Sequence, residues 1–192
     1  MDELLHQLDD ATNVLLAEPS IGQSRDVCTS LLLDRREHPN VLFVTYTRQP
    51  SACLDQVASD VERVGVITVG DGPTAGTGDG VVVESVSTPS DLTGLGIKIG
   101  QFLREWEAPL FVCFDSLTPM LQYVEFQTAY EFLHAITGQI YAAGATSHFH
   151  IDPQAHDETH VAGITSLFDA KVSLDGEPTV RTRTALQTFR SN

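Results

Sequence analysis

The stretch NVLLAEPSIGQS, residues 13–24, decides the fold. Its first five residues are mostly apolar, as in a strand that is covered on both faces of a sheet. The next seven include proline, glycine and serine, which favour a loop. An amphipathic segment with Val27, Leu31 and Leu32 follows, and this spacing predicts a helix. A strand, a loop and a helix in this order are the context of a phosphate-binding loop.

Outward from this stretch, short apolar segments continue to alternate with amphipathic ones. We expect strands at residues 13–17, 41–46, 64–69, 110–115, 145–150 and 170–174. Helices are expected after Ser24, Pro50 and Val124 and over residues 90–106, where apolar side chains return every three or four residues. A looser alternation at residues 178–189 predicts a C-terminal antiparallel strand or hairpin. The pattern predicts an α/β fold with a mostly parallel central sheet, in a single domain over residues 1–192.

A second glycine-rich segment, GDGPTAGTGDG, covers residues 70–80. It follows an expected strand but opens no helix, and a dinucleotide-binding loop requires that helix. We therefore expect a solvent-exposed loop here.

The charge of the chain limits its partners. The sequence has 26 acidic and 11 basic residues, a formal net charge of −15, and the acid is spread along the chain. Lys98 and Lys171 are the only lysines, a composition similar to that of proteins from high-salt cytoplasm. An acidic surface without clustered Lys and Arg argues against binding to nucleic acid or anionic membrane. Because no long apolar segment or signal peptide is visible, we expect a cytoplasmic protein.

The loop at residues 17–24 departs from the phosphate-binding motif G-x-x-x-x-G-K-[ST]. Ala17 takes the place of the first glycine and Gln23 that of the lysine, while Gly22 and Ser24 match. The lysine supplies a charge to the phosphates of a nucleotide, whereas Gln23 offers only neutral hydrogen bonds. Asp26 adds a negative charge at the end of the helix that would attract phosphate. Nucleotide binding should be weakened, and phosphoryl transfer more so.

Several segments taken in order resemble the KaiC and RadA branch of RecA-like ATPases. They are NVLLAEPSIGQS, VLFVTYTRQPSACL, SDLTGLGIKIGQFL, LFVCFDSLTPML, AAGATSHFH and SLFDAKVSL. The similarity covers nearly the whole chain and looks closest to haloarchaeal KaiC-like proteins with a degenerate phosphate-binding loop. It implies a three-layer RecA-like fold of the P-loop NTPase type. It also implies that the strand ending near His148 lies between the strand ending at Asp115 and the first strand.

The resemblance also assigns candidate nucleotide contacts. Asp115 matches the Walker B acid, and Ser116 follows it, although Asp115 is also explained as a turn acid after a buried strand. Thr47 and Arg48 occupy the positions where the family has a pair of glutamates that orient the attacking water. A nucleotide, if one binds, would therefore contact Ala17, Glu18, Pro19, Ser20, Ile21, Gly22, Gln23, Ser24, Asp115 and Ser116. The hydroxyl of Ser24 would serve magnesium, or would simply cap the helix.

Four of the seven histidines fall in HFHIDPQAHDETH, residues 148–160. These metal-ligand candidates are His148, His150, His156 and His160. The first two share a face if the strand continues, and the last two share a face if a helix has begun. The spacing matches no standard zinc motif, so we favour a polar loop over a metal site. The clustered histidines of such a loop would respond to pH, because neighbouring carboxylates stabilise the charged imidazolium.

The three cysteines, Cys28, Cys53 and Cys113, are far apart and each lies within an apolar pattern. We expect them to be small core residues in a reducing compartment, without disulfides.

Three hypotheses follow. The leading one is a non-catalytic RecA-like domain in regulation or signal transduction, which binds a protein partner or self-associates and needs no cofactor. The second is a diverged ATP-binding protein or weak ATPase that uses Ser24 and Asp115 with magnesium. The third is a metal-binding or pH-responsive protein built on the histidine cluster. Hydrolysis is not expected, because the lysine and both glutamates are missing.

Overall fold

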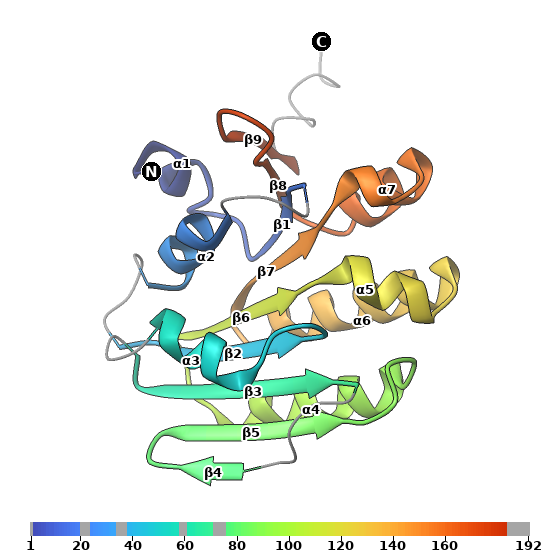
Figure 1. Ribbon diagram of the computed structural model, residues 1–192. Helices are drawn as coiled ribbons and strands as arrows, with labels where there is room; N and C mark the ends of the chain where they lie inside the picture. Colours follow the sequence, from blue (N-terminus) through green and yellow to red (C-terminus); the bar gives the residue numbers. More distant parts are fainter. Residues whose placement is uncertain (1, 20–23, 34–37, 58–60, 71–75, 184–192) are drawn as a thin grey trace.

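The computed structural model describes residues 2–19, 24–33, 38–57, 61–70 and 76–183 (Figure 1). In these residues the strands form one sheet of nine, in the order β4-β5-β3-β2-β6-β7-β1-β8-β9. The strands from β5 to β8 in this order run parallel to their neighbours, and the edge strands β4 and β9 are antiparallel. The predicted α/β fold with a mostly parallel sheet and a C-terminal antiparallel strand is confirmed.

The predicted strands are all present, with ends shifted by at most one residue. They are β1 (Asn13–Ala17), β2 (Asn40–Thr45), β3 (Arg63–Val69), β6 (Leu110–Asp115), β7 (Thr146–Ile151) and β8 (Ala170–Ser173). The antiparallel C-terminal strand is β9 (Thr179–Thr182), and residues 184–192 lie outside the described part. As expected, β7 lies between β6 and β1.

One part of the sheet differs from the sequence analysis. The glycine-rich segment was expected to be a loop throughout, but β4 (Gly76–Gly78) pairs antiparallel with β5 (Val81–Val86), a strand that was not predicted. β5 in turn pairs with β3, so β5 and β4 extend this side of the sheet by two strands. β4 is held by backbone hydrogen bonds to β5. Its three residues, two of them glycine, are too few to show the side-chain alternation that predicts a strand.

Helices cover both faces of the sheet, in three layers (Figure 1). On one face lie α1 (Asp2–Gln7), α2 (Ser24–Leu33) and α3 (Pro50–Val57), and their apolar side chains pack against the sheet. The other face carries α4 (Leu92–Glu105), α5 (Leu117–Tyr123), α6 (Phe126–Ala142) and α7 (Glu158–Thr165). A short 3₁₀ turn, η1 (Pro153–Ala155), precedes α7.

The helix predicted at residues 90–106 shows how the sequence sets these elements. The carboxylate of Asp91 accepts a hydrogen bond from the Gly94 N–H at 2.8 Å and caps the start of α4. Leu95 and Ile99, one turn apart, are fully buried against the sheet. None of the described helices has the length and apolar composition that crossing a bilayer requires.

Candidate metal centre

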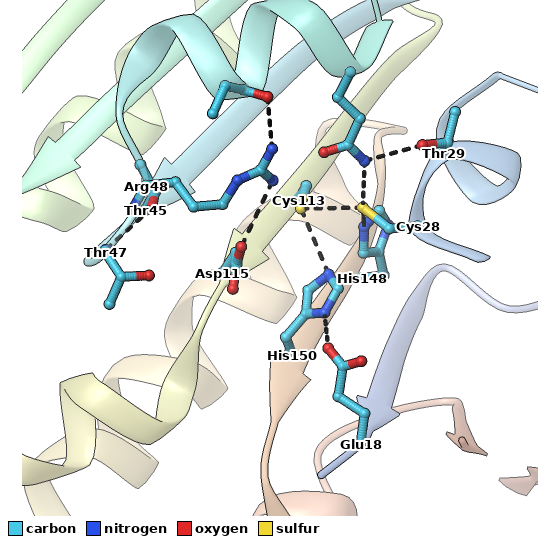
Figure 2. A network of polar contacts seen from close by, with 12 residues as sticks. Glu18, Cys28, Thr29, Thr45, Thr47, Arg48, Cys113, Asp115, His148 and His150 are labelled. Atoms are coloured by element: carbon cyan, nitrogen blue, oxygen red, sulfur yellow. Dashed lines mark hydrogen bonds and ion pairs between the residues drawn. The ribbon is translucent and has the colours of Figure 1, made fainter. Parts of the chain in front are cut away.

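Two thiols and two imidazoles meet inside the protein, between α2 and the sheet (Figure 2). They belong to Cys28, Cys113, His148 and His150, and all four residues are buried. The four atoms that could bind a metal, one from each residue, lie within 4.8 Å of one another. Buried polar groups gathered this closely need partners, either hydrogen bonds or a bound ion.

The sheet and one helix bring the four residues together. His148 and His150 are two residues apart on β7, so both side chains point to the same face. Cys113 is the Cα partner of His148 across the β6 and β7 pair, which puts its thiol on that face as well. Cys28 reaches the group from α2, which packs over this face of the sheet.

The separations of three contacting pairs are close to those between the ligands of a tetrahedral zinc ion. The two sulfurs are 3.7 Å apart, Cys28 Sγ lies 3.1 Å from His148 Nε2, and Cys113 Sγ lies 3.7 Å from His150 Nε2. With zinc bond lengths of about 2.3 Å to sulfur and about 2.05 Å to nitrogen, a tetrahedron has edges of about 3.8 Å between sulfurs and about 3.6 Å from sulfur to nitrogen. The sulfur–sulfur and Cys113–His150 distances already fit these edges. To close around an ion, the Cys28–His148 pair would have to open by about 0.5 Å, and the most distant atoms, which lie within 4.8 Å, would have to approach.

The residues around the cluster orient its members. His150 Nδ1 lies 2.9 Å from Glu18 Oε1, a contact that directs Nε2 of the same ring toward the thiols. In metal sites a carboxylate often holds a histidine in this way and fixes the tautomer that binds the metal. On the opposite side, Gln56 Nε2 donates to Cys28 Sγ at 3.1 Å. Figure 2 shows the chain of contacts from Glu18 through His150 to the two cysteines.

The pKa values of the cluster are perturbed. The hydrogen bond with Cys113 lowers the pKa of the Cys28 thiol, against the opposing effect of burial. Burial raises the pKa of Cys113, and the contact with Cys28 adds to this rise. For His150, burial favours the neutral ring, but hydrogen bonds with Cys28 and Glu18 outweigh it and raise the pKa to about 10. These directions favour a negative charge on Cys28 and a positive charge on His150.

A cavity of about 520 Å³ adjoins the cluster at the carboxyl ends of the central strands. Cys28 and His150 line it, and so do Arg48 and Asp115. Arg48 Nη1 lies 3.6 Å from Asp115 Oδ2, and Arg48 Nη2 donates to the Ala52 carbonyl at 2.7 Å. The buried Thr45 hydroxyl accepts the Arg48 backbone N–H at 2.8 Å and sets the turn that presents this arginine.

The predicted nucleotide contacts are only partly brought together. Ala17 is buried at the end of β1, Glu18 contacts His150, and Pro19 lines the cavity. Ser20, Ile21, Gly22 and Gln23 lie outside the described residues, and α2 begins at Ser24. Asp115 and Ser116 line the cavity, and the Ser116 hydroxyl accepts the Thr118 N–H at 3.3 Å as the cap of α5.

The four predicted metal-ligand histidines are divided between two places. His148 and His150 join the cluster on β7, as their shared face suggested. His156 Nε2 instead lies 3.2 Å from Thr118 Oγ1, and His160 stacks on Phe126 with ring centroids 4.1 Å apart. The polar loop expected at 148–160 is largely structured, because η1 and α7 follow β7.

The cysteines of the cluster were not predicted as metal ligands. All three cysteines are free and buried, as predicted, but two of them also supply its thiols. Cys28 and Cys113 are 85 residues apart, and Cys28 and His148 are 120 apart. No local spacing marks such a site. The sequence indicates only part of the site: alternation along each strand puts His148 and His150 on one face of β7. The pairing of Cys113 with His148 depends on the register between β6 and β7.

Comparisons with known proteins support the fold and leave the activity open. No curated protein matches the chain. A solved structure from Pyrococcus horikoshii OT3 is similar, with a TM-score of 0.64 and 10% sequence identity, covering 94% of this chain and 91% of that one. At this identity the similarity shows a shared fold alone. Residues 11–174, which contain all four members of the cluster, match the family of unknown function DUF7504, and the chain therefore belongs to that family.

Proposed function

We propose that the protein is a zinc-binding α/β domain in which Cys28, Cys113, His148 and His150 hold the ion. The observation that carries this proposal is the set of separations among the four side chains, 3.1 to 3.7 Å for the contacting pairs. Two thiolates and two imidazoles form a donor set that binds zinc in preference to magnesium or calcium, which favour oxygen ligands.

The residues that contact the four proposed ligands support the same proposal. Glu18 accepts the Nδ1–H of His150, which leaves the Nε2 lone pair for the metal. Among the described residues, Glu18 Oε2 is buried without a hydrogen-bond partner, and a cation nearby would offset the cost of that arrangement. The Gln56 N–H donates to Cys28 Sγ and would stabilise the negative charge of a zinc-bound thiolate.

Four protein ligands leave no position on the zinc for water or a substrate. Such closed sites are structural or regulatory, whereas catalytic zinc sites keep one open position. We therefore assign the zinc a structural or regulatory role. A closed site is compatible with the non-catalytic role in the leading hypothesis. The zinc itself belongs to the third hypothesis, a metal-binding protein, because the leading one needed no cofactor.

Metal analysis of the untagged protein tests the proposal. We expect about one zinc ion per chain after purification without chelator, as for a site with four protein ligands. Replacing zinc with cobalt(II) should give the visible absorption bands of tetrahedral cobalt and charge-transfer bands from the thiolates. The double variant Cys113→Ser with His148→Ala should lose both signals. The matched control, Cys53→Ser with His156→Ala, changes the same residue types outside the cluster and should keep them.

Two outcomes would contradict the proposed zinc site. A full-length protein that takes up no zinc under reducing conditions, or a control variant that loses metal as the cluster variant does, would exclude this function. Circular dichroism of each variant separates loss of metal from loss of fold.

Nucleotide binding is a second candidate, favoured by the cavity at the carboxyl ends of parallel strands. Open α/β sheets bind ligands at this edge. Asp115 and Ser116 line the cavity, in keeping with the resemblance to RecA-like ATPases. Against it, Arg48 contacts Asp115 and Gln23 carries no charge. Calorimetry with magnesium and ATP tests this candidate, and saturable binding that Asp115→Ala abolishes would support it.

A further inference from the structure

The two thiols of the cluster touch each other, and they come from different elements. Cys28 lies on α2 and Cys113 on β6, with the sulfurs 3.7 Å apart. A disulfide bond is about 2.0 Å long, so the sulfurs need to approach by about 1.7 Å. Rotation of each cysteine side chain about χ1 is the movement that brings the sulfurs together. The third cysteine, Cys53, lies on α3.

The two thiols differ in their access to small molecules. Cys28 lines the 520 Å³ cavity, whereas Cys113 is fully buried and is not among the residues that line it. A reagent that enters the cavity therefore meets Cys28 before Cys113, whose sulfur is 3.7 Å from that of Cys28. Reversible oxidation requires that an oxidant reach a thiolate and that a second, resolving cysteine lie next to it. Cys28, which lines the cavity although only 2% of its surface is exposed, and Cys113 supply such a pair.

We propose that Cys28 is oxidised by hydrogen peroxide, that Cys113 then forms a disulfide with it, and that this reaction releases the zinc. The proposal rests on the proposed function, because zinc release requires a zinc site. It adds a modification site and a means by which oxidants control the occupancy of the metal centre.

Each step of the reaction balances. Metal ligation keeps the sulfur of Cys28 deprotonated. The sulfur attacks one peroxide oxygen, so that an S–O bond forms, the O–O bond breaks, and the departing hydroxide takes a proton and leaves as water. Cys113 Sγ, also deprotonated as a ligand, then attacks the sulfur of this sulfenic acid, and an S–S bond forms. The S–O bond breaks, and the departing hydroxide takes a proton from solvent and leaves as a second water. The two sulfurs together lose two electrons, peroxide gains them, and zinc keeps its charge.

Formation of the disulfide removes two of the four ligands. The sulfurs of a disulfide carry no thiolate charge, and His148 and His150 alone are a poor site for zinc compared with four ligands. His150 lines the cavity together with Cys28, so the ion has a path out on that side. Reduction of the disulfide restores both thiolates and the site.

The test uses the untagged, zinc-loaded full chain exposed to hydrogen peroxide. Zinc content is measured before the oxidant is added. Zinc release is then followed with a chromogenic chelator, and the cysteines are mapped by mass spectrometry of peptides. We expect release in step with a Cys28–Cys113 disulfide, with Cys53 remaining reduced, and rebinding of zinc after treatment with dithiothreitol. Cys53→Ser should behave as the wild type.

Zinc that stays bound while Cys28 and Cys113 stay reduced, at peroxide concentrations that oxidise free cysteine, would overturn the proposal. Irreversible sulfinic acid at Cys28 without a disulfide would overturn it too. The Cys113→Ser variant gives an independent check, because it should accumulate a sulfenic acid at Cys28 that dimedone traps. Failure of the proposed function is seen separately, as zinc missing from the reduced protein before any oxidant is added.

Discussion

Arg48 Nη1 lies 3.6 Å from Asp115 Oδ2 in the wall of the cavity, where two neighbouring strands, β2 and β6, end. The guanidinium thus places a fixed positive charge beside the carboxylate that the RecA-like resemblance assigns to magnesium. Both side chains are mostly buried, with 19% and 25% of their area exposed, so solvent screens the pair only in part. Binding of a metal ion to Asp115 would have to displace or compete with this arginine.

The first prediction concerns Arg48. Wild-type protein should show no saturable heat with magnesium and ATP at millimolar concentration, because Asp115 is already paired. Arg48→Gln removes the competing charge and should strengthen magnesium binding at Asp115, as measured by calorimetry, without creating ATP hydrolysis. Asp115→Asn in the same background is the control and should remove the gain. Tight ATP binding by the wild type would contradict this prediction.

The second prediction concerns removal of the metal. Zinc at a hundred times its dissociation constant stabilises the folded state by about 2.7 kcal/mol. In a chain of this size that corresponds to roughly 5–10 °C in melting temperature. A chelator should lower the melting temperature of the wild type by this amount, as followed by calorimetry. The double variant Cys113→Ser with His148→Ala should not respond, and an equal response from it would place the metal elsewhere.

The third prediction concerns Glu18 as a positioning residue. Glu18→Ala removes the acceptor for His150 Nδ1 and should weaken zinc binding about 10- to 100-fold. Glu18→Gln keeps an acceptor oxygen at this position and should recover part of that loss. Competition with a chelator of known affinity measures both variants, and Glu62→Gln, an exposed carboxylate, is the control. A cluster that binds zinc equally well in all three variants would show that Glu18 has no such role.

The fourth prediction concerns Cys53 and pH. Burial raises the pKa of Cys53 to about 11, so at pH 8 its thiolate is about a hundred times rarer than that of a thiol with the usual pKa of 9.0. Because the thiolate is the reacting form, alkylation by iodoacetamide should be slow at pH 8. It should speed up about tenfold per pH unit and level off near pH 11. Peptide mapping of the folded protein at several pH values measures this rate, and fast alkylation at neutral pH would show that the thiol is exposed.

Much of the fold was predictable because local patterns determine it. The buried strand β1 and the amphipathic helix α4 each carry a period that the sequence displays directly. β4 and β5 were missed, because glycine-rich residues in β4 pair through the backbone, and the half-buried run in β5 lacks a clear alternation. Pairing between strands depends on neighbours distant in sequence, which no local period records.

The metal centre also depends partly on local sequence and partly on tertiary packing. The sequence by itself determined that His148 and His150 share one face, because they are two residues apart in a strand, and that Cys28 and Cys113 are core residues. Only the tertiary structure decided that these four side chains meet while His156 and His160 lie apart. The physical reason is that parallel pairing of β6 with β7 sets Cys113 beside His148, and packing of α2 on the sheet adds Cys28 across 85 residues of chain.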